Sequence, residues 1–160
     1  MNKSRLLQLI VERLTADLDT ARRAAQSAYE TATHKENIAE NKYDTLGLEA
    51  SYLATGQARR MEEIRQALAL YQQLGLRPYD PERGIAVGDL VVLEDLDGKR
   101  QQVFLGPEAA GLKLPMDGQV VTVITPRSPL GQGLLGKRPG DALHLSVAGV
   151  GQEHEVFDVR

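Results

Sequence analysis

The stretch "LLQLIVERLTADLDTARRAAQSAYETA", residues 6–32, decides the fold of the first half of this chain. Its apolar residues recur every three or four positions, which is the spacing of one face of an α-helix. Ser4 precedes the pattern and is a candidate N-cap for the helix. We expect a single apolar stripe formed by Leu7, Ile10, Leu14, Leu18, Ala21, Ala25, Ala28 and Ala32.

A second helical stripe follows further along the chain. It ends at Gly75, and Pro78 follows three residues later, as is typical of a helix C-terminus. Gly47 and Gly56 lie inside the pattern, and each costs about 1 kcal/mol relative to alanine in a helix, so the straightness of this helix stays open. The stripe runs through Ala39, Tyr43, Leu46, Ala50, Leu53, Gln57, Met61, Ile64, Leu68 and Tyr71.

Two such helices are most economically arranged as an antiparallel hairpin over residues 1–75, and we expect the chain to reverse near residue 35. That reversal would place Ile10 near Met61 and Leu18 near Leu53. The alanine-rich part of the first helix would then face bulkier residues of the second, which permits a close approach. The sequence therefore predicts a narrow coiled coil.

After residue 75 the pattern changes to that of a small, mostly antiparallel α+β domain. Residues 76–84 are rich in proline and glycine and are predicted to be a linker, with the domain spanning residues 85–160. Two β-rich runs flank Asp97-Gly98, a strong signal for a two-residue hairpin turn. We further expect a strand in "QVVTVITP", a short helix or turn in "PLGQGLLG", and a closing hairpin in "ALHLSVAGVGQEHEVFDV", residues 142–159.

Composition limits the possible functions. The chain of 160 residues has a net charge of −3, and neither half has the excess of basic charge that duplex binding needs. It contains no cysteine, which excludes disulfides and thiolate metal sites. The first residues lack a signal-peptide cleavage site, and no run of 18 apolar residues follows. We expect a soluble, cytoplasmic protein without contact to membranes.

Three carboxylates stand four residues apart in "ATHKENIAENKYD", residues 32–44. With a reversal near residue 35, Glu36 lies at or next to the end of the hairpin, and Glu40 and Asp44 follow on one side of the second helix. Carboxylates in such a place can supply oxygen ligands to Mg²⁺. The alternative is a solvated helix N-terminus, where acidic residues are common.

Several motifs together resemble the Gre transcript-cleavage factor family over essentially the whole chain. They are "KEN" at residues 35–37, "VGDLVVLEDLDGK" at 87–99, "FLGPEAAG" at 104–111 and "SPLGQGLLGKRPGDAL" at 128–143. The resemblance implies an FKBP-like second domain that docks on bacterial RNA polymerase at the rim of its secondary channel. The docking residues would be Ser128, Pro129, Leu130, Leu134 and Leu135, although the leucines could also belong to the core.

The resemblance also implies a role for the end of the hairpin. It would enter the channel and act as a cofactor, not an enzyme, while the polymerase cleaves backtracked RNA at its own Mg²⁺. Glu36 would share a metal ion with the polymerase and orient the attacking water. The residues that would support it are Thr33, His34, Lys35, Asn37, Glu40 and Asp44.

Thr33 departs from the family pattern, because a carboxylate is expected at this position. A hydroxyl is a much weaker ligand for Mg²⁺ than a carboxylate. Two alternatives to a cleavage cofactor therefore stay open: a non-cleaving modulator that occupies the secondary channel, and an unrelated coiled-coil adaptor protein.

Other candidate residues are less specific. By the resemblance, Arg22, Arg23, Arg59 and Arg60 would contact the 3′ segment of the nascent RNA, although the expected reversal would not bring the two pairs level; ordinary helix surface is the alternative. His144 and His154 lack a second ligand at metal spacing and are interpreted as structural. A prolyl isomerase needs an aromatic-lined pocket, and the second half contains only Tyr79, Phe104 and Phe157.

Overall fold

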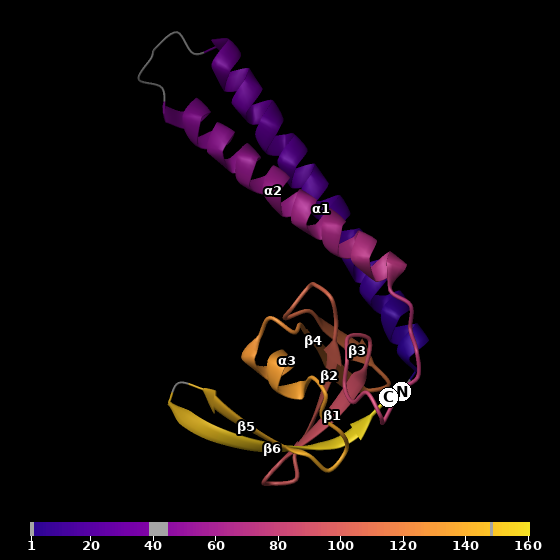
Figure 1. Cartoon of the computed structure of the whole chain (residues 1–160). Helices are drawn as coiled ribbons and strands as arrows, with labels where there is room; N and C mark the ends of the chain where they lie inside the picture. Colours follow the sequence, from indigo (N-terminus) through magenta and orange to yellow (C-terminus); the bar gives the residue numbers. More distant parts are fainter. Residues whose placement is uncertain (1, 39–44, 148) are drawn as a thin grey trace. The chain divides into compact units, whose positions relative to one another are not determined.

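The fold is a helical hairpin followed by a six-stranded α+β domain, as predicted (Figure 1). The computed structural model describes residues 2–38, 45–147 and 149–160, and the side chains among these except at 35–52 and 147. The chain divides into two compact units, Met1–Ile10 with Leu70–Arg160, and Val11–Ala69. The elements are α1 (Lys3–Ile38), α2 (Thr45–Gln73), β1 (Leu90–Asp95), β2 (Arg100–Leu105), β3 (Lys113–Met116), β4 (Gln119–Ile124), α3 (Pro129–Leu134), β5 (Ala142–Val147) and β6 (Val150–Val159).

Most of the predicted apolar stripe of α1 is buried, but Leu6 is buried in place of Leu7, and Ala25 is only partly buried. Ile10, Leu14, Leu18, Ala21, Ala28 and Ala32 are all less than one-tenth exposed. On α2 the buried residues are Ile64, Ala67, Leu68 and Tyr71, whereas Leu53 is 56% exposed. The predicted partnership of Leu18 with Leu53 is therefore wrong.

The chain reverses later than predicted, because α1 continues to Ile38. No glycine or proline lies between Arg22 and Ile38, so nothing in the sequence ends the helix at residue 35. The connection falls among residues 39–44, outside the described residues, and Glu40 and Asp44 lie there too. A later reversal shifts every cross-helix pair toward the C-terminal end of α2.

The ends and the interior of the helices also differ in detail from the predictions. The Asn2 side chain caps α1 by accepting hydrogen bonds from the backbone N–H groups of Ser4 and Arg5, at 2.9 and 3.2 Å, so Asn2 rather than Ser4 is the N-cap. α2 continues as one helix through Gly47 and Gly56. Among the described residues, no helix is long and apolar enough to cross a membrane.

The sheet has the strand order β3-β4-β2-β1-β6-β5 and is antiparallel except where β2 pairs with β4. The predicted hairpin of β1 and β2 is present, but its turn has three residues between Asp95 and Lys99, with Gly98 at φ 81°. The Asp95 carboxylate fixes this turn by accepting hydrogen bonds from the backbone N–H groups of Asp97 and Lys99. β3 was not predicted.

One face of the sheet forms a core with α3. This core consists of Ile85, Val91, Leu93, Val103, Leu105, Leu134, Leu143, Val156 and Val159. α3 lies close to the preceding loop because Gly131 has no side chain: a Cβ there would collide with the carbonyl oxygen of Thr125. The glycines of "PLGQGL" thus serve packing and bring the Ser128 segment close to the sheet.

Candidate functional site

The segment that begins at Ser128 is a capped helical turn. The Ser128 hydroxyl accepts a hydrogen bond from the Gly131 N–H at 3.0 Å and donates one to the Thr125 carbonyl at 2.9 Å. Pro129 occupies the first helical position, where its missing N–H costs nothing. The serine and the proline therefore have local structural roles, because they start α3 at a fixed place.

The three leucines of this segment have different environments. Leu134 is fully buried in the domain core, so it cannot contact a partner while the domain is folded. Leu130 is partly buried against the same core, and Leu135 is 44% exposed. Of the predicted docking leucines, Leu135 thus offers the most surface to a partner, and the role of Leu134 is corrected to a core residue.

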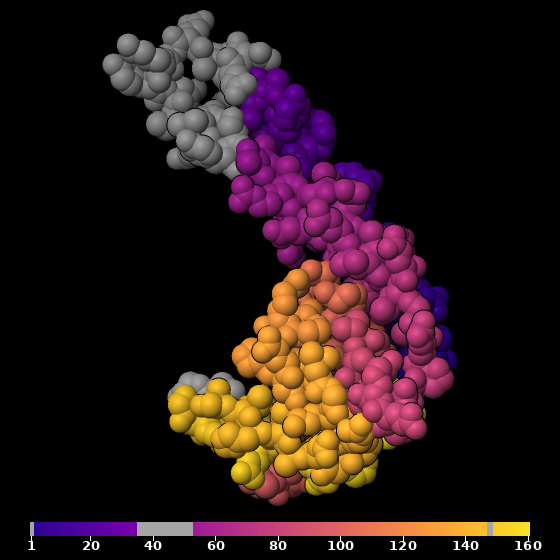
Figure 2. Space-filling view, in the orientation of Figure 1, coloured from indigo at the N-terminus to yellow at the C-terminus, as the bar shows by residue number. Residues whose placement is uncertain are grey.

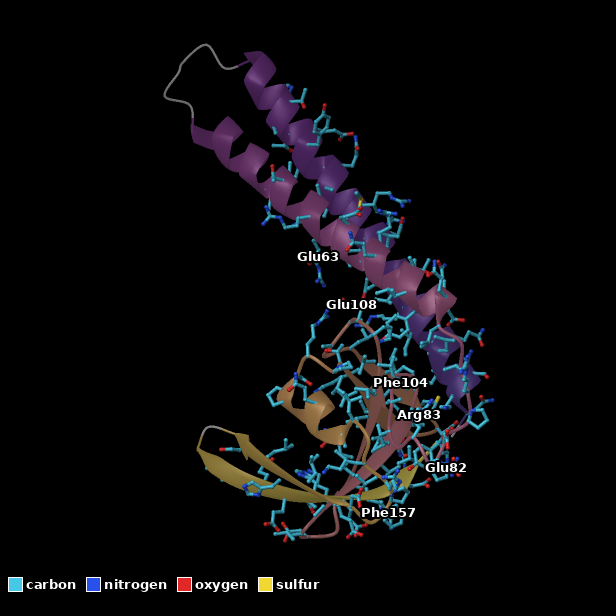
Figure 3. All side chains as sticks on the ribbon, viewed as in Figure 1. Glu63, Glu82, Arg83, Phe104, Glu108 and Phe157 are labelled. Carbon is cyan, nitrogen blue, oxygen red and sulfur yellow. The ribbon has the colours of Figure 1, made fainter. Side chains whose placement is uncertain are left out.

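Arg127, directly before this segment, connects it to the loop after β2. Its guanidinium donates two hydrogen bonds to the Glu108 carboxylate, at 2.8 and 2.7 Å, and this contact holds the pKa of Glu108 below its usual value. The backbone carbonyl of Glu108, which is labelled in Figure 3, accepts a hydrogen bond from the Tyr71 hydroxyl at 2.7 Å. The last turn of α2 and the Ser128 segment therefore hold the same loop.

The "KRPGD" part of the motif fastens the segment before β1. The Arg138 guanidinium donates hydrogen bonds to the backbone carbonyls of Pro81 and Glu82, at 2.6 and 2.8 Å. Its own N–H donates to the Asp141 carboxylate at 2.8 Å. The predicted linker, residues 76–84, is thus tied to the turn before β5.

The predicted catalytic end of the hairpin forms the last turns of α1. Thr33 is partly buried and His34 is exposed, and the backbone from Lys35 to Asn37 is helical. In a helix, Thr33 and Glu36 are neighbours on one face because they are three positions apart. The side chains of Lys35, Glu36 and Asn37 lie outside the described ones, so their metal-binding role stays a prediction.

The two arginine pairs predicted to contact RNA, on α1 and on α2, lie closer to the same height along the helical hairpin than expected. A groove with a volume of about 490 Å³ is lined by Arg22, Ala25, Gln26 and Tyr29 of α1 and by Ala54, Thr55, Ala58 and Met61 of α2. Arg22 thus shares a groove with the residues that flank Arg59 and Arg60, and the prediction that the two pairs are not level is wrong. All four arginines are exposed, and Arg23 forms an ion pair with Asp19 at 2.7 Å.

No family model matches this chain, but known proteins similar to it along most of its length exist. The transcription elongation factor GreA of Desulfovibrio desulfuricans is 28% identical over 152 residues, which cover 93% of this chain and 86% of that protein. This similarity spans both the helical hairpin and the Ser128–Asp141 motif. The chain is similar to the Gre factor GreA over nearly its whole length.

Two solved structures of Gfh1 proteins are also similar to this chain. GreA factor homolog 1 (Gfh1) of Thermus thermophilus is 28% identical, with 94% of each chain covered and a TM-score of 0.38. Gfh1 of Thermus aquaticus is 25% identical, with 92% of each chain covered and a TM-score of 0.39.

A second polar cluster of this chain was not predicted from the sequence. The buried Asp89 carboxylate accepts hydrogen bonds from the Ala86 N–H at 2.9 Å and the Arg83 guanidinium at 3.2 Å. The Lys3 ammonium lies 3.6 Å from it and donates to the Arg77 carbonyl. Burial lowers the pKa of Lys3, and the nearby Asp89 opposes this shift. No motif could reveal this cluster, because its members are up to 86 positions apart.

Proposed function

We propose that this chain is a Gre-family transcription elongation factor that binds bacterial RNA polymerase and inserts its helical hairpin into the secondary channel. There Glu36 would stimulate cleavage of backtracked RNA, while the polymerase carries out the reaction. The observation that carries the proposal is the similarity to GreA over 93% of the chain, which includes both the hairpin and the Ser128 segment. The catalytic Mg²⁺ would belong to the polymerase, and Glu36 would supply an oxygen ligand to it and orient water.

Docking is proposed to use the exposed surface around Ser128, Pro129 and Leu135. Leu135→Asp would place a charge on this surface without touching the core, because Leu135 is 44% exposed. A matched control is Leu96→Asp, since Leu96 is 82% exposed in the turn after β1. In a pull-down with core polymerase, we expect Leu135→Asp to lose binding and Leu96→Asp to keep it. Failure of the unmodified protein to bind would favour the adaptor alternative.

Cleavage is tested on stalled, backtracked transcription complexes. We expect RNA shortening that is lost in Glu36→Ala and kept in Glu30→Ala. Glu30 is an exposed acid on the same helix, so the control removes the same charge away from the proposed catalytic position. Equal activity of the two variants would argue against a catalytic role for Glu36.

The second candidate function is that of a non-cleaving modulator, which Thr33 favours. A second carboxylate at this position would give Mg²⁺ two protein ligands on one helical face, whereas the threonine hydroxyl is a weak ligand. Inhibition of transcription without RNA shortening, still present in Glu36→Ala, would identify the modulator.

The groove beside Arg22 is proposed to lie near the 3′ segment of the backtracked RNA. Arg22, Arg59 and Arg60 could neutralise phosphates there. We expect the double variant Arg59→Ala, Arg60→Ala to reduce RNA shortening or inhibition more than Arg13→Ala does. Arg13 is also exposed on α1, where it pairs with Asp17, but it lies two turns or more before this groove. If the double variant and Arg13→Ala have equal effects, Arg59 and Arg60 are ordinary helix surface and do not contact the RNA.

A further inference from the structure

Tyr29 is a large aromatic side chain that α1 leaves exposed on the helical hairpin. Its exposed fraction is 61%. Aromatic residues usually bury most of their surface, and their rings contribute strongly to binding when a partner covers them. A single exposed apolar side chain needs no explanation by itself, so the surroundings of Tyr29 decide whether it forms part of a binding site.

Tyr29 lines the groove of about 490 Å³ between α1 and α2, whose surfaces adjoin in Figure 2, in indigo and magenta. Ala25, Ala54 and Ala58 line the same groove. Each alanine side chain is a single methyl group, so these residues form a shallow apolar surface beside the much larger tyrosine ring. A flat ring from a ligand can therefore approach Tyr29 over the alanines.

The charge of the groove is positive. Among the described residues that line it, Arg22 alone is charged. Within the described part of the chain Arg22 has no ion-pair partner, whereas Arg23 next to it pairs with Asp19 at 2.7 Å. Glu30, which does not line the groove, accepts a hydrogen bond from the Gln26 side chain at 2.9 Å. The cation of Arg22 is therefore available to an anionic ligand, such as the phosphate of a nucleotide.

Tyr29 lies on the face of α1 that leads to the proposed catalytic end of the hairpin. Thr33 and Glu36 follow it at four and seven positions, which is the spacing of one helical face. Seven residues of an α-helix span about 10 Å, which is the length of about three stacked nucleotides. A strand of RNA that reaches Glu36 along this face therefore passes Tyr29 within about three nucleotides.

We propose that Tyr29 stacks on an unpaired base of the RNA 3′ segment, while Arg22 contacts a phosphate of the same strand. This assignment rests on the proposed function, which brings the RNA to this face of the hairpin. An aromatic ring beside an arginine is a common arrangement for binding single strands: the base stacks on the ring, and the cation neutralises the backbone. Such stacking tolerates any base, because every base has a flat face.

A nucleobase fits this groove better than a side chain of a protein partner does. Protein interfaces depend on anchor side chains that fill deep, desolvated pockets, whereas the alanines leave this groove shallow. A protein partner also favours a contiguous apolar patch, but Arg22, Gln26 and Thr55 line the groove as well. A base needs only one open face of an aromatic ring and a positive charge nearby for its phosphate.

Substitutions of Tyr29 test the stacking on stalled, backtracked transcription complexes. The quantity measured is the concentration of protein that gives half-maximal RNA shortening or, for a modulator, half-maximal inhibition. We expect Tyr29→Ala to raise this concentration at least about fivefold, because the loss of one stacked base weakens binding by that factor or more. Tyr29→Phe keeps the ring and should leave the concentration unchanged. Leu53→Ala is the matched control, because Leu53 is also a large exposed side chain of the hairpin, at 56%, but does not line the groove.

RNA with an abasic nucleotide identifies what occupies the groove. Each of the first nucleotides 3′ of the polymerase active centre, about three in all, is replaced in turn by an abasic ribose. At one of these positions we expect the abasic RNA to weaken the effect by about the same factor as Tyr29→Ala, and the two changes together to weaken it no more than either alone. If the two losses multiply at every position, the groove binds something other than a base, such as a side chain of the polymerase, and the proposal is overturned.

The unmodified protein separates a failure of the stacking from a failure of the proposed function. If it neither shortens RNA nor inhibits transcription, the proposed function fails, and the stacking at Tyr29 fails with it. If the unmodified protein is active and Tyr29→Ala is equally active at every concentration, only the stacking fails.

Discussion

The Tyr71 hydroxyl donates a hydrogen bond to the backbone carbonyl of Glu108 at 2.7 Å, and the Glu108 side chain is held in turn by Arg127. Tyr71 is fully buried in the last turns of α2, and Arg127 directly precedes the Ser128 segment. One loop after β2 thus receives contacts from the helix that leads out of the hairpin and from the proposed docking segment. The stability of this loop therefore affects both the end of α2 and the proposed docking segment at Ser128.

Tyr71→Phe should destabilise the protein by about 1 to 2 kcal/mol. The ring still fills its site, but the carbonyl of Glu108 loses its partner in a partly buried place. Burial also raises the pKa of Tyr71, so the hydroxyl stays protonated and able to donate at any ordinary pH. The measurement is the free energy of unfolding from urea titration. Tyr29→Phe is the matched control, because Tyr29 is 61% exposed and should change stability by less than about 0.5 kcal/mol. Equal losses would show that the hydroxyl contributes nothing specific.

Alanine substitutions at two glycines should have opposite effects. A Cβ on Gly106 would collide with the Tyr71 hydroxyl and lie 3.2 Å from a methyl group of Val123, so Gly106→Ala should cost about 2 kcal/mol or more. Among the described residues, no atom outside the backbone of α2 lies within 4 Å of a Cβ on Gly56, so Gly56→Ala should stabilise the protein by up to about 1 kcal/mol. Thermal and urea unfolding of both variants checks the signs. A loss of stability in Gly56→Ala would indicate that α2 needs the glycine for another reason.

The Glu108–Arg127 pair should make stability depend on pH in the acidic range. Arg127 lowers the pKa of Glu108 in the folded state below the unfolded value, which is about 4.3. The folded state then binds protons less readily, so the stabilisation is present above the unfolded pKa and is lost as pH falls through the folded pKa. Solvent screens this pair, because the Arg127 side chain is exposed, so its contribution to stability is small. Glu108→Gln should be less stable than the unmodified protein at pH 7 and equal to it in strong acid. Glu155→Gln, which changes an exposed residue of β6, should show no such convergence.

The helices could be predicted from the sequence because their apolar periodicity is long and unbroken. The position of the reversal could not be predicted, because no residue near "KEN" ends a helix. The prediction of a reversal near residue 35 rested only on the position of "KEN" within the hairpin. The helix-forming residues up to Ile38 extend α1 instead. The error in register at Leu53 and Arg22 followed directly from that misplaced turn.

The sheet was predicted where strands alternate clearly and are joined by short turns. β3 was missed because it has only four residues and contains Pro115, which normally argues against a strand. The parallel pairing of β2 with β4 was missed for a related reason: without β3 between them in the sequence, nothing suggested a crossover. The candidate site was predicted from motifs, but the contacts of Tyr71, Glu108 and Arg127 depend on tertiary structure that the sequence alone does not reveal.

Thr33→Asp should convert this chain into a stronger cleavage factor if the proposed function is correct. Thr33 lies in α1 three positions before Glu36, so an aspartate there would present a second carboxylate on the same face of the helix. The substitution has a small cost, because an acid near a helix C-terminus opposes the dipole. We expect RNA shortening on backtracked complexes to rise at least about tenfold, which corresponds to about 1.4 kcal/mol of transition-state stabilisation. Thr31→Asp adds the same charge two positions earlier, on a different face, and should leave the rate unchanged. If both variants remain inactive while still inhibiting transcription, the missing carboxylate is not what prevents cleavage, and the chain acts as a modulator.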